Sequence, residues 1–502
     1  MKKTSNLMQK AGRFLFDNKV ILVFAVIVIG AILVSGSPLY FVVDGIISRL
    51  GRNMFIVLAL IIPVVAGMGL NFGIVIGAIA AQIAVFCVVY WGLGGIGGML
   101  LTFLLTTPLA VFFGWLGGKL FNSMKGAEMI AGLILGYFAD GLYQLLFLVL
   151  IGGVIPVKDS PLIIAGGVGV KITVDLTGNL KYALDNVTVW QMLLASFVAA
   201  VVVLFVKLAL RAFGKMTLVR KDYVPAAALA VIFGLCQIPF LKQLLSISHI
   251  RLLSALTIVL AVFLVWQIYK IVRNKVLKGK AQAGFKLSRS IFMVLLALGL
   301  YALTYIPTIE TVLRMVSFPL LPFVLIAMIW IFNTKILDTR IGQNMRTVGQ
   351  SQTVATASGI DVDKTRVIAM TISTVLASWG QLIYLQNLGT FSTYGAHLQI
   401  GQFAIAALLV GGASVQKATN RQALIGVILF HALFIVAPEA GKVLFGNAHI
   451  GEYFRVFVSY GVIALSLAMH AWKRLQKSDD ATQPPHDQGM TDQSAKGSTQ
   501  PA

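Results

Sequence analysis

Residues 320–385 read LLPFVLIAMIWIFNTKILDTRIGQNMRTVGQSQTVATASGIDVDKTRVIAMTISTVLASWGQLIYL, which is an apolar run, a polar stretch and a second apolar run. These apolar runs belong to the longer candidate spans 313–332 and 366–388, and each span fits the about 17–25 residues that a helix needs to cross a hydrocarbon core. Similar runs recur along the whole chain. A β-barrel would instead show short segments of alternating hydrophobicity. The sequence therefore predicts an all-α, polytopic transmembrane helix bundle.

We expect about 10–14 spans, because residues 53–91 form either two straight helices or a discontinuous or re-entrant path. Residues 53–69 and 71–91 are separated by Leu70 alone, and the run 128–155 is long for one span and is expected to tilt or to extend outside. The candidate crossings are 20–36, 53–69, 71–91, 97–116, 128–155, 189–210, 224–241, 250–272, 290–307, 313–332, 366–388, 398–416, 421–437 and 455–472.

Composition and charge support a membrane location. Of the 502 residues 58% are hydrophobic and 12% are charged, whereas about a quarter are charged in soluble proteins. The net charge of +22 would suggest nucleic acid in a soluble protein. Here most Lys and Arg residues fall in loops that face the cytoplasm if both termini are cytoplasmic, which is the bias of bacterial inner-membrane proteins. We therefore predict no nucleic-acid partner, and contact of the basic loop 270–289 with anionic membrane lipid.

Residues 1–472 are predicted to form the membrane domain, and 473–502, which lack apolar residues, a disordered cytoplasmic tail. The outer loop 156–188 contains Ile172, Val174 and Leu176 in alternation with polar residues, before Thr-Gly-Asn. This pattern predicts a small β-hairpin on the outer surface. The hairpin is either a docking lip for an outside partner or a loop without a role of its own.

Catalytic motifs are absent from the sequence. There is no G-x-x-x-x-G-K-[ST] phosphate loop, no H-E-x-x-H zinc motif and no G-x-S-x-G nucleophile motif. A G-x-G-x-x-G at Gly92, Gly94 and Gly97 lies between membrane helices rather than between a strand and a helix, so we discard it. We predict no catalytic residue, no metal site and no cofactor bound by this chain.

Small and polar residues inside the apolar runs mark a candidate translocation path. Gly69, Gly73, Gly77 and Ala81 recur every fourth residue and predict one helical stripe, which serves either close helix packing or a path. Asp140 lies within an apolar run, where a carboxylate costs about 2.5–3.5 kcal/mol and must face a cavity or a partner. Interhelical hydrogen bonding is the alternative role for the buried amides Gln82, Gln144, Gln381 and Gln402 and for His431. The predicted path residues are Asn71, Gly73, Gly77, Gln82, Asp140, Gln144 and Gln402.

The polar stretch between the two opening runs predicts a short helix. Ser351 is placed to cap QTVATAS, Gly359 to end it in a left-handed conformation, and Asp361 or Asp363 to cap the next helix. About two turns are too short to be stable alone in water, so the helix must pack against something. Ala355 and Ala357 keep it slim, which suits a groove on a partner protein; the alternative is a packed intracellular loop.

Three motifs in this chain resemble those of ABC-importer permeases of the ribose, nucleoside and branched-chain amino acid group. TVGQSQTVATASGIDVDKTRV resembles the family's cytoplasmic loop, GQFAIAALLVGGASV its apolar helix ending in Gly411 and Gly412, and AGMGLNFGIVIGAIAA its glycine-rich segment. The resemblance covers roughly 53–150 and 313–472. It departs after Gly412, where further glycines are usual, and in 156–310, which shorter members lack.

The resemblance implies that 1–472 is a permease domain for a small polar solute such as a nucleoside, sugar, vitamin or amino acid. Separate ABC ATPase subunits would use the ATP, and would grip the cytoplasmic coupling loop 333–365. A second permease subunit and an extracytoplasmic solute-binding protein would complete the importer. The implied coupling residues are Arg346, Gly349, Gln350, Ser351, Ala355, Ala357, Gly359 and Ile360. The alternative from another class is an ion-coupled secondary transporter that uses Asp140.

Overall fold

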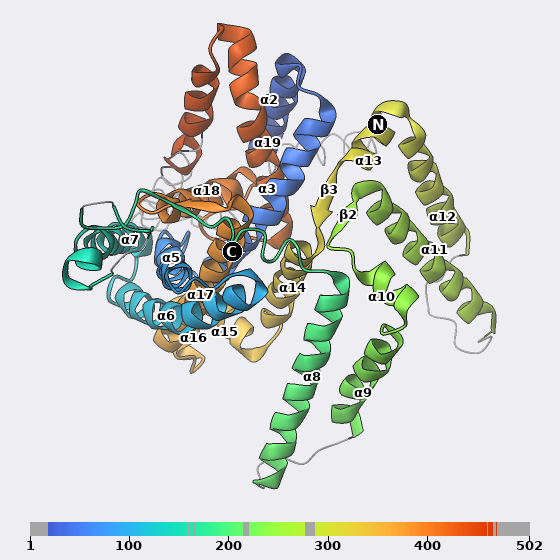
Figure 1. The fold of residues 1–502 in the computed structure, drawn as a ribbon, viewed down its shortest axis with the longest axis horizontal. Coiled ribbons are helices and arrows are strands. Elements are labelled where there is room, and N and C mark those ends of the chain that lie inside the picture. Colours follow the sequence, from blue (N-terminus) through green and yellow to red (C-terminus); the bar gives the residue numbers. More distant parts are fainter. Residues whose placement is uncertain are drawn as a thin grey trace, which may run out of the picture.

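The computed structural model describes residues 19–157, 161–164, 167–213, 220–276, 287–458, 460–464 and 468. Helices make up most of this part of the chain, which confirms the all-α polytopic bundle (Figure 1). The predicted tail 473–502 lies outside the described residues.

The first seven helical elements run from the N-terminal side to the outer loop. They are α2 (Lys19–Ser35), α3 (Leu39–Ala59), α4 (Ile61–Val65), α5 (Ile74–Tyr90), α6 (Gly95–Ser123), α7 (Glu128–Leu145) and its π-helical continuation η1 (Leu146–Val154). Next come α8 (Val189–Ala212), α9 (Arg220–Leu235), α10 (Pro239–Leu245), α11 (Leu252–Val276), α12 (Leu287–Ala302), η2 (Leu303–Tyr305) and α13 (Pro307–Met315). The last part contains α14 (Leu320–Ile336), α15 (Arg340–Gln350), α16 (Gln352–Ala357), α17 (Val362–Leu388), α18 (Ala396–Val410) and α19 (Asn420–Phe445). Residues 448–458 and 460–464 are also helical, and are called the terminal helix below.

Within the described residues, 7 helices are long and apolar enough to cross a membrane, and the count reaches 10 when each bent pair is one span. Ten is the lower end of the expected range. The bends are 103° between α9 and α10, 88° before α13 and 73° between α14 and α15. The expectation of broken segments is confirmed. Three apolar helices, in α2, α5 and α18, are shorter.

The chain breaks between α4 and α5, at residues 66–73, as the discontinuous interpretation of 53–91 predicts. The predicted start of this region at 53 is wrong, because the helix already begins at Leu39. Charged residues at 44, 49 and 52 hid its first half from a search for apolar runs.

The predicted glycine stripe is only partly helical. Gly69 lies in the break with a φ of +72°, and Gly73 is the N-cap of α5. Gly77 and Ala81 alone belong to the helix. The four-residue spacing of these residues predicted one continuous helix, but the break at 66–73 separates Gly69 from the helix that contains Gly77 and Ala81.

The predicted local β-hairpin in the outer loop is wrong. Strand β1 (Thr173–Asp175) pairs antiparallel with β4 (Thr390–Ser392), which follows α17, and Val174 lies opposite Phe391. A second pair joins β2 (His249–Arg251) to β3 (Ser317–Pro319). The alternating pattern indicated a strand at 173–175 but gave no information about which strand it pairs with. The turns that follow Asp175 form backbone hydrogen bonds with the end of α17, where the Tyr182 N–H donates to the Gln386 carbonyl oxygen.

Helix α17 is the centre of the main body, where it packs against α3, α5 and α6 (Figure 1). Small residues allow these close contacts. A Cβ at Gly77 of α5 would lie 2.6 Å from the Thr374 carbonyl oxygen, and one at Gly114 of α6 would lie 2.7 Å from the Thr371 Cα. In lipid, such close backbone approach replaces the missing hydrophobic drive between helices.

Helices α8–α12 extend away from this body as two pairs, α8 with α9 and α11 with α12 (Figure 1). Helix α8 has no buried residue although it is strongly apolar. Such a helix suits a lipid environment.

Candidate functional site

The polar loop 333–365 folds into the two short helices α15 and α16, each with a defined start. The Thr339 hydroxyl accepts from the Gly342 N–H, and the Ser351 hydroxyl accepts from the Val354 N–H at 3.3 Å. Gly359 has a φ of +76°, and Asp361 Oδ1 accepts from the Lys364 N–H to cap α17. The predicted cap at Ser351 and the left-handed Gly359 are confirmed. Of the two candidate caps Asp361 and Asp363, it is Asp361 that caps α17. That α15 is a separate helix was not expected.

The two alanines of α16 have different surroundings. Ala355 is fully buried in a small apolar cluster with Val348 of α15 and Val362 of α17. Ala357 is exposed, and the neighbouring Val354 side chain is 57% exposed. Ala355 therefore packs α16 against its own chain. Val354 and Ala357 lie on the exposed surface of α16, together with Thr353 and Thr356.

Gly349, near the end of α15, lies against the break between α4 and α5. A Cβ at Gly349 would overlap the carbonyl oxygen of Val65, and one at Gly67 would lie 2.7 Å from the Gly349 Cα. Gly67 itself has a φ of +76°. Any side chain at Gly349 would push the two segments apart. The backbones of α15 and of the break are therefore in direct contact at this point.

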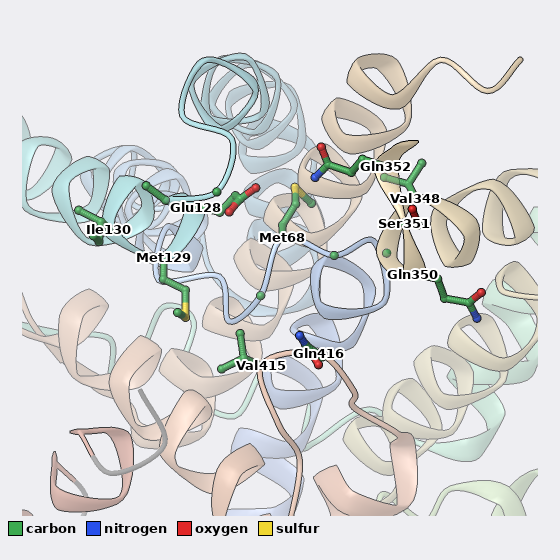
Figure 2. Close-up of a pocket in the computed structure, with 15 residues that line it drawn as sticks. Met68, Glu128, Met129, Ile130, Val348, Gln350, Ser351, Gln352, Val415 and Gln416 are labelled. Carbon is green, nitrogen blue, oxygen red and sulfur yellow. The ribbon is translucent and has the colours of Figure 1, made fainter. Parts of the chain in front are cut away.

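A cavity of about 390 Å³ opens where four segments meet beside this contact (Figure 2). Its walls are the break at 67–69, the α6–α7 turn at 126–130, the α15–α16 junction at 348–352 and the residues Val415 and Gln416. A second cavity of about 540 Å³ shares Gly349, Gln350 and Gln416 and includes Arg346, whose guanidinium lies 3.8 Å from Asp338. Four of the predicted coupling residues line these cavities, namely Arg346, Gly349, Gln350 and Ser351. The other four, Ala355, Ala357, Gly359 and Ile360, do not line either of them.

A buried ion pair lies next to the first cavity. Arg366 of α17, which is 0% exposed, donates to Glu128 Oε1 at 2.9 Å and to the Phe121 carbonyl oxygen at 3.1 Å. The pair joins α17 to the end of α6 and the start of α7. Sequence analysis missed it because both residues lie at the edge of predicted spans, where charges are ordinary. The sequence feature that could have indicated this pair is that Glu128 and Arg366 are each the first residue of a predicted span.

Asp140 has partners, as its position in an apolar run requires. Its Oδ1 lies 2.7 Å from His397 Nε2, and its Oδ2 accepts from Gln144 Nε2 at 2.9 Å. The Tyr143 ring lies 4.7 Å from the His397 ring. His397, at the start of α18, was missed because it falls just outside the predicted span 398–416.

The predicted path residues divide into two groups. Asp140, Gln144 and Gln402 lie along α7 and α18, and Gln402 accepts from the Tyr460 hydroxyl at 3.2 Å and lines a cavity of about 30 Å³. Asn71, Gly73, Gly77 and Gln82 lie in and before α5. Asn71 and Gln82 are 0% exposed, and their side-chain amides have no hydrogen-bond partner among the described residues. Helix α5 packs against both α7 and α18, so the two groups lie on neighbouring elements. Their role in translocation stays a prediction.

These features define a multi-pass membrane protein with a compact polar segment, α15–α16, packed on the ends of its central helices. The chain matches, over residues 189–469, the family described as branched-chain amino acid transport system permease component, and it belongs to that family. The family is one of membrane permease components. The family match includes most of residues 156–310, which the motif resemblance did not cover, and it does not include residues 53–150, which the motif resemblance did cover.

One curated relative is similar over a shorter stretch. It is the xylose transport system permease protein XylH of Haemophilus influenzae, 27% identical over 155 residues. The aligned part is 31% of this chain and 39% of the relative, so the match spans less than half of the relative's length. No solved structure matches the chain.

Proposed function

We propose that this chain is the membrane subunit of an ATP-driven importer for a small polar solute, in a bacterial inner membrane with both termini cytoplasmic. Family membership supports the permease role, and the relative's name concerns the sugar xylose. The observation that carries the coupling proposal is the contact of α15 with the break at 66–73. It connects an exposed helical segment to the interior of the bundle.

In this proposal separate ABC ATPase subunits bind α15 and α16. Val354 and Ala357 enter a groove on the ATPase, while Ala355 holds α16 to α17 and Gly349 holds α15 to the break. Closure of the ATPases moves this unit, and it must favour one permease conformation over the other for any shift in population to follow. A second permease subunit and an outside solute-binding protein complete the assembly.

A charged or a bulky side chain at the exposed surface of α16 is expected to disrupt the assembly without unfolding the permease. Val354→Glu and Ala357→Trp should each reduce copurification of the ATPase by about tenfold or more, because truncating or blocking a central contact costs about 2 kcal/mol or more. Copurification from membranes, with the permease level as reference, measures the effect. The matched control is Ile172→Glu, which places the same charge at an exposed aliphatic residue beside β1.

Equal copurification for Val354→Glu, Ala357→Trp and wild type would contradict the proposed docking surface. Loss with Ile172→Glu as well would indicate a general defect of the membrane protein rather than a local one.

The Asp140–His397 pair favours one alternative, an ion-coupled transporter. If the importer proposal holds, Asp140→Asn should lower ATP-dependent uptake in vesicles by about tenfold or less, since an amide keeps one hydrogen bond of the pair. Uptake by the isolated chain, driven by a proton gradient and abolished by Asp140→Asn, would support the alternative. Gln144→Leu, which removes only the amide partner, is the control for packing.

A further inference from the structure

Three arginines gather where α3, α19 and the terminal helix meet. Arg49 and Arg52 lie on α3, and Arg455 lies on the terminal helix. All three are partly buried. Arg49 is close enough to Arg52 and Arg455 for their positive charges to repel its own. His431 of α19, which is 3% exposed, is within electrostatic range of Arg49 and Arg52. We call these four residues the arginine cluster.

Side-chain contacts are made by three members of the arginine cluster, Arg455, His431 and Arg52. Arg455 Nη1 donates to the Phe434 carbonyl oxygen at 2.7 Å, and its guanidinium lies 4.8 Å from the Phe434 ring. The His431 ring lies 6.2 Å from the same ring. The Arg52 guanidinium lies 5.6 Å from the Tyr384 ring of α17.

Acidic groups do not balance this charge. Glu452 pairs with Arg455 at 3.0 Å. Asp185 attracts Arg52, but its two oxygens already accept from Gln386 and Asn387, both at 2.7 Å. In the part of the chain that the structure describes, no carboxylate lies within ion-pair distance of Arg49 or Arg52.

Two nitrogen atoms of the arginine cluster also make no hydrogen bond to the described residues. Arg52 Nε and His431 Nδ1 are buried and have no hydrogen-bond partner among the described residues. Arg49 and Arg52 lie about 15 Å and 20 Å along α3 from its first residue, which is well inside the span Leu39–Val65. An ionisable residue inside a span is costly, and unpaired examples mark substrate or ion sites.

We propose that the arginine cluster binds an anionic group, a carboxylate or a phosphate, of the solute that crosses this permease. This inference rests on the proposed function and narrows its substrate class to acidic solutes. Guanidinium groups bind such oxygens through two parallel N–H donors, and the binding is stronger than for neutral acceptors. An anion would supply the negative charge that Arg49 and Arg52 lack and an acceptor for Arg52 Nε.

Binding of radiolabelled inorganic phosphate to the purified full-length permease tests the proposal. Equilibrium dialysis in maltoside detergent should show saturable binding that acetate displaces and the neutral sugar xylose does not. Arg49→Gln and Arg52→Gln should each weaken binding by about tenfold or more. Arg49→Lys and Arg52→Lys, which keep the charge, should retain part of it. The control is Arg314→Gln, at an arginine paired with Glu310 on peripheral helix α13.

A lipid phosphate has the same chemistry as a solute phosphate, and the test separates the two sources. Dialysis is repeated in nanodiscs of phosphatidylcholine and of phosphatidylglycerol. Phosphate binding that persists in both supports a solute site. Binding lost only in phosphatidylglycerol would assign the arginine cluster to lipid and overturn the proposal. Non-saturable binding, or equal binding by wild type and both Gln variants, would overturn it as well. ATPase copurification is a separate readout, so failure here leaves the importer proposal intact.

Discussion

Glu128→Ala is expected to lower the free energy of unfolding by about 3–5 kcal/mol, because it leaves the buried guanidinium of Arg366 without a counter-charge. Arg366 is the largest fully buried side chain among the described residues. The loss should appear in denaturant-induced unfolding of the purified permease. The control Lys125→Ala removes a partner of Asp363 from an exposed pair nearby, and should change stability by about 0–1 kcal/mol.

A double variant separates charge from packing at this site. Glu128→Leu combined with Arg366→Met replaces the pair by apolar side chains, and should recover most of the stability that Glu128→Ala loses. If the single and double variants were equally unstable, the buried charge would not be the cause. If Glu128→Ala resembled Lys125→Ala, the pair would not be buried as described.

Gly349→Ala is expected to separate α15 from the break at 66–73. Its Cβ would overlap the carbonyl oxygen of Val65. This is a backbone atom, so it cannot move aside as the end of a flexible side chain can. Overpacking of this kind costs about 1–3 kcal/mol. Because the contact connects the coupling loop to the bundle, ATP-dependent uptake should fall by about tenfold or more while ATPase copurification persists. Hydrogen exchange at 66–73 should become faster.

Gly299→Ala is the control for this substitution. Gly299 lies inside α12, and a Cβ there meets no atom within 4 Å. Alanine should be neutral there or stabilise the helix by up to about 1 kcal/mol. Unchanged exchange and uptake in Gly349→Ala would show that the close contact with Val65 does not couple the two segments.

Sequence analysis predicted the helical class, most span positions and the capped helix α16, because these depend on local signals. Apolar length fixes a span, and Ser351 and Gly359 fix helix ends through their own backbone geometry. The start of α3 was missed because Arg49 and Arg52 interrupt its apolar pattern. The two residues that interrupt the pattern are the same two that α3 contributes to the arginine cluster.

Pairings between distant segments could not be predicted. The partner of β1 is β4, the partner of Asp140 is His397, and each depends on the folded arrangement of helices rather than on nearby residues. Ala355 and Ala357 show the same limit within one helix. Both are small, yet only the arrangement of α15 and α17 decides that Ala355 is the buried one.

Photo-crosslinking in living cells tests the central claim, that a separate ATPase grips α16. A photoreactive residue at position 354 should capture a nucleotide-hydrolysing protein, and the same residue at position 172 should not. Capture that depends on nucleotide state would show that the contact follows the ATPase cycle. If position 354 captured no such protein while the permease was inserted and abundant, the importer account would be contradicted.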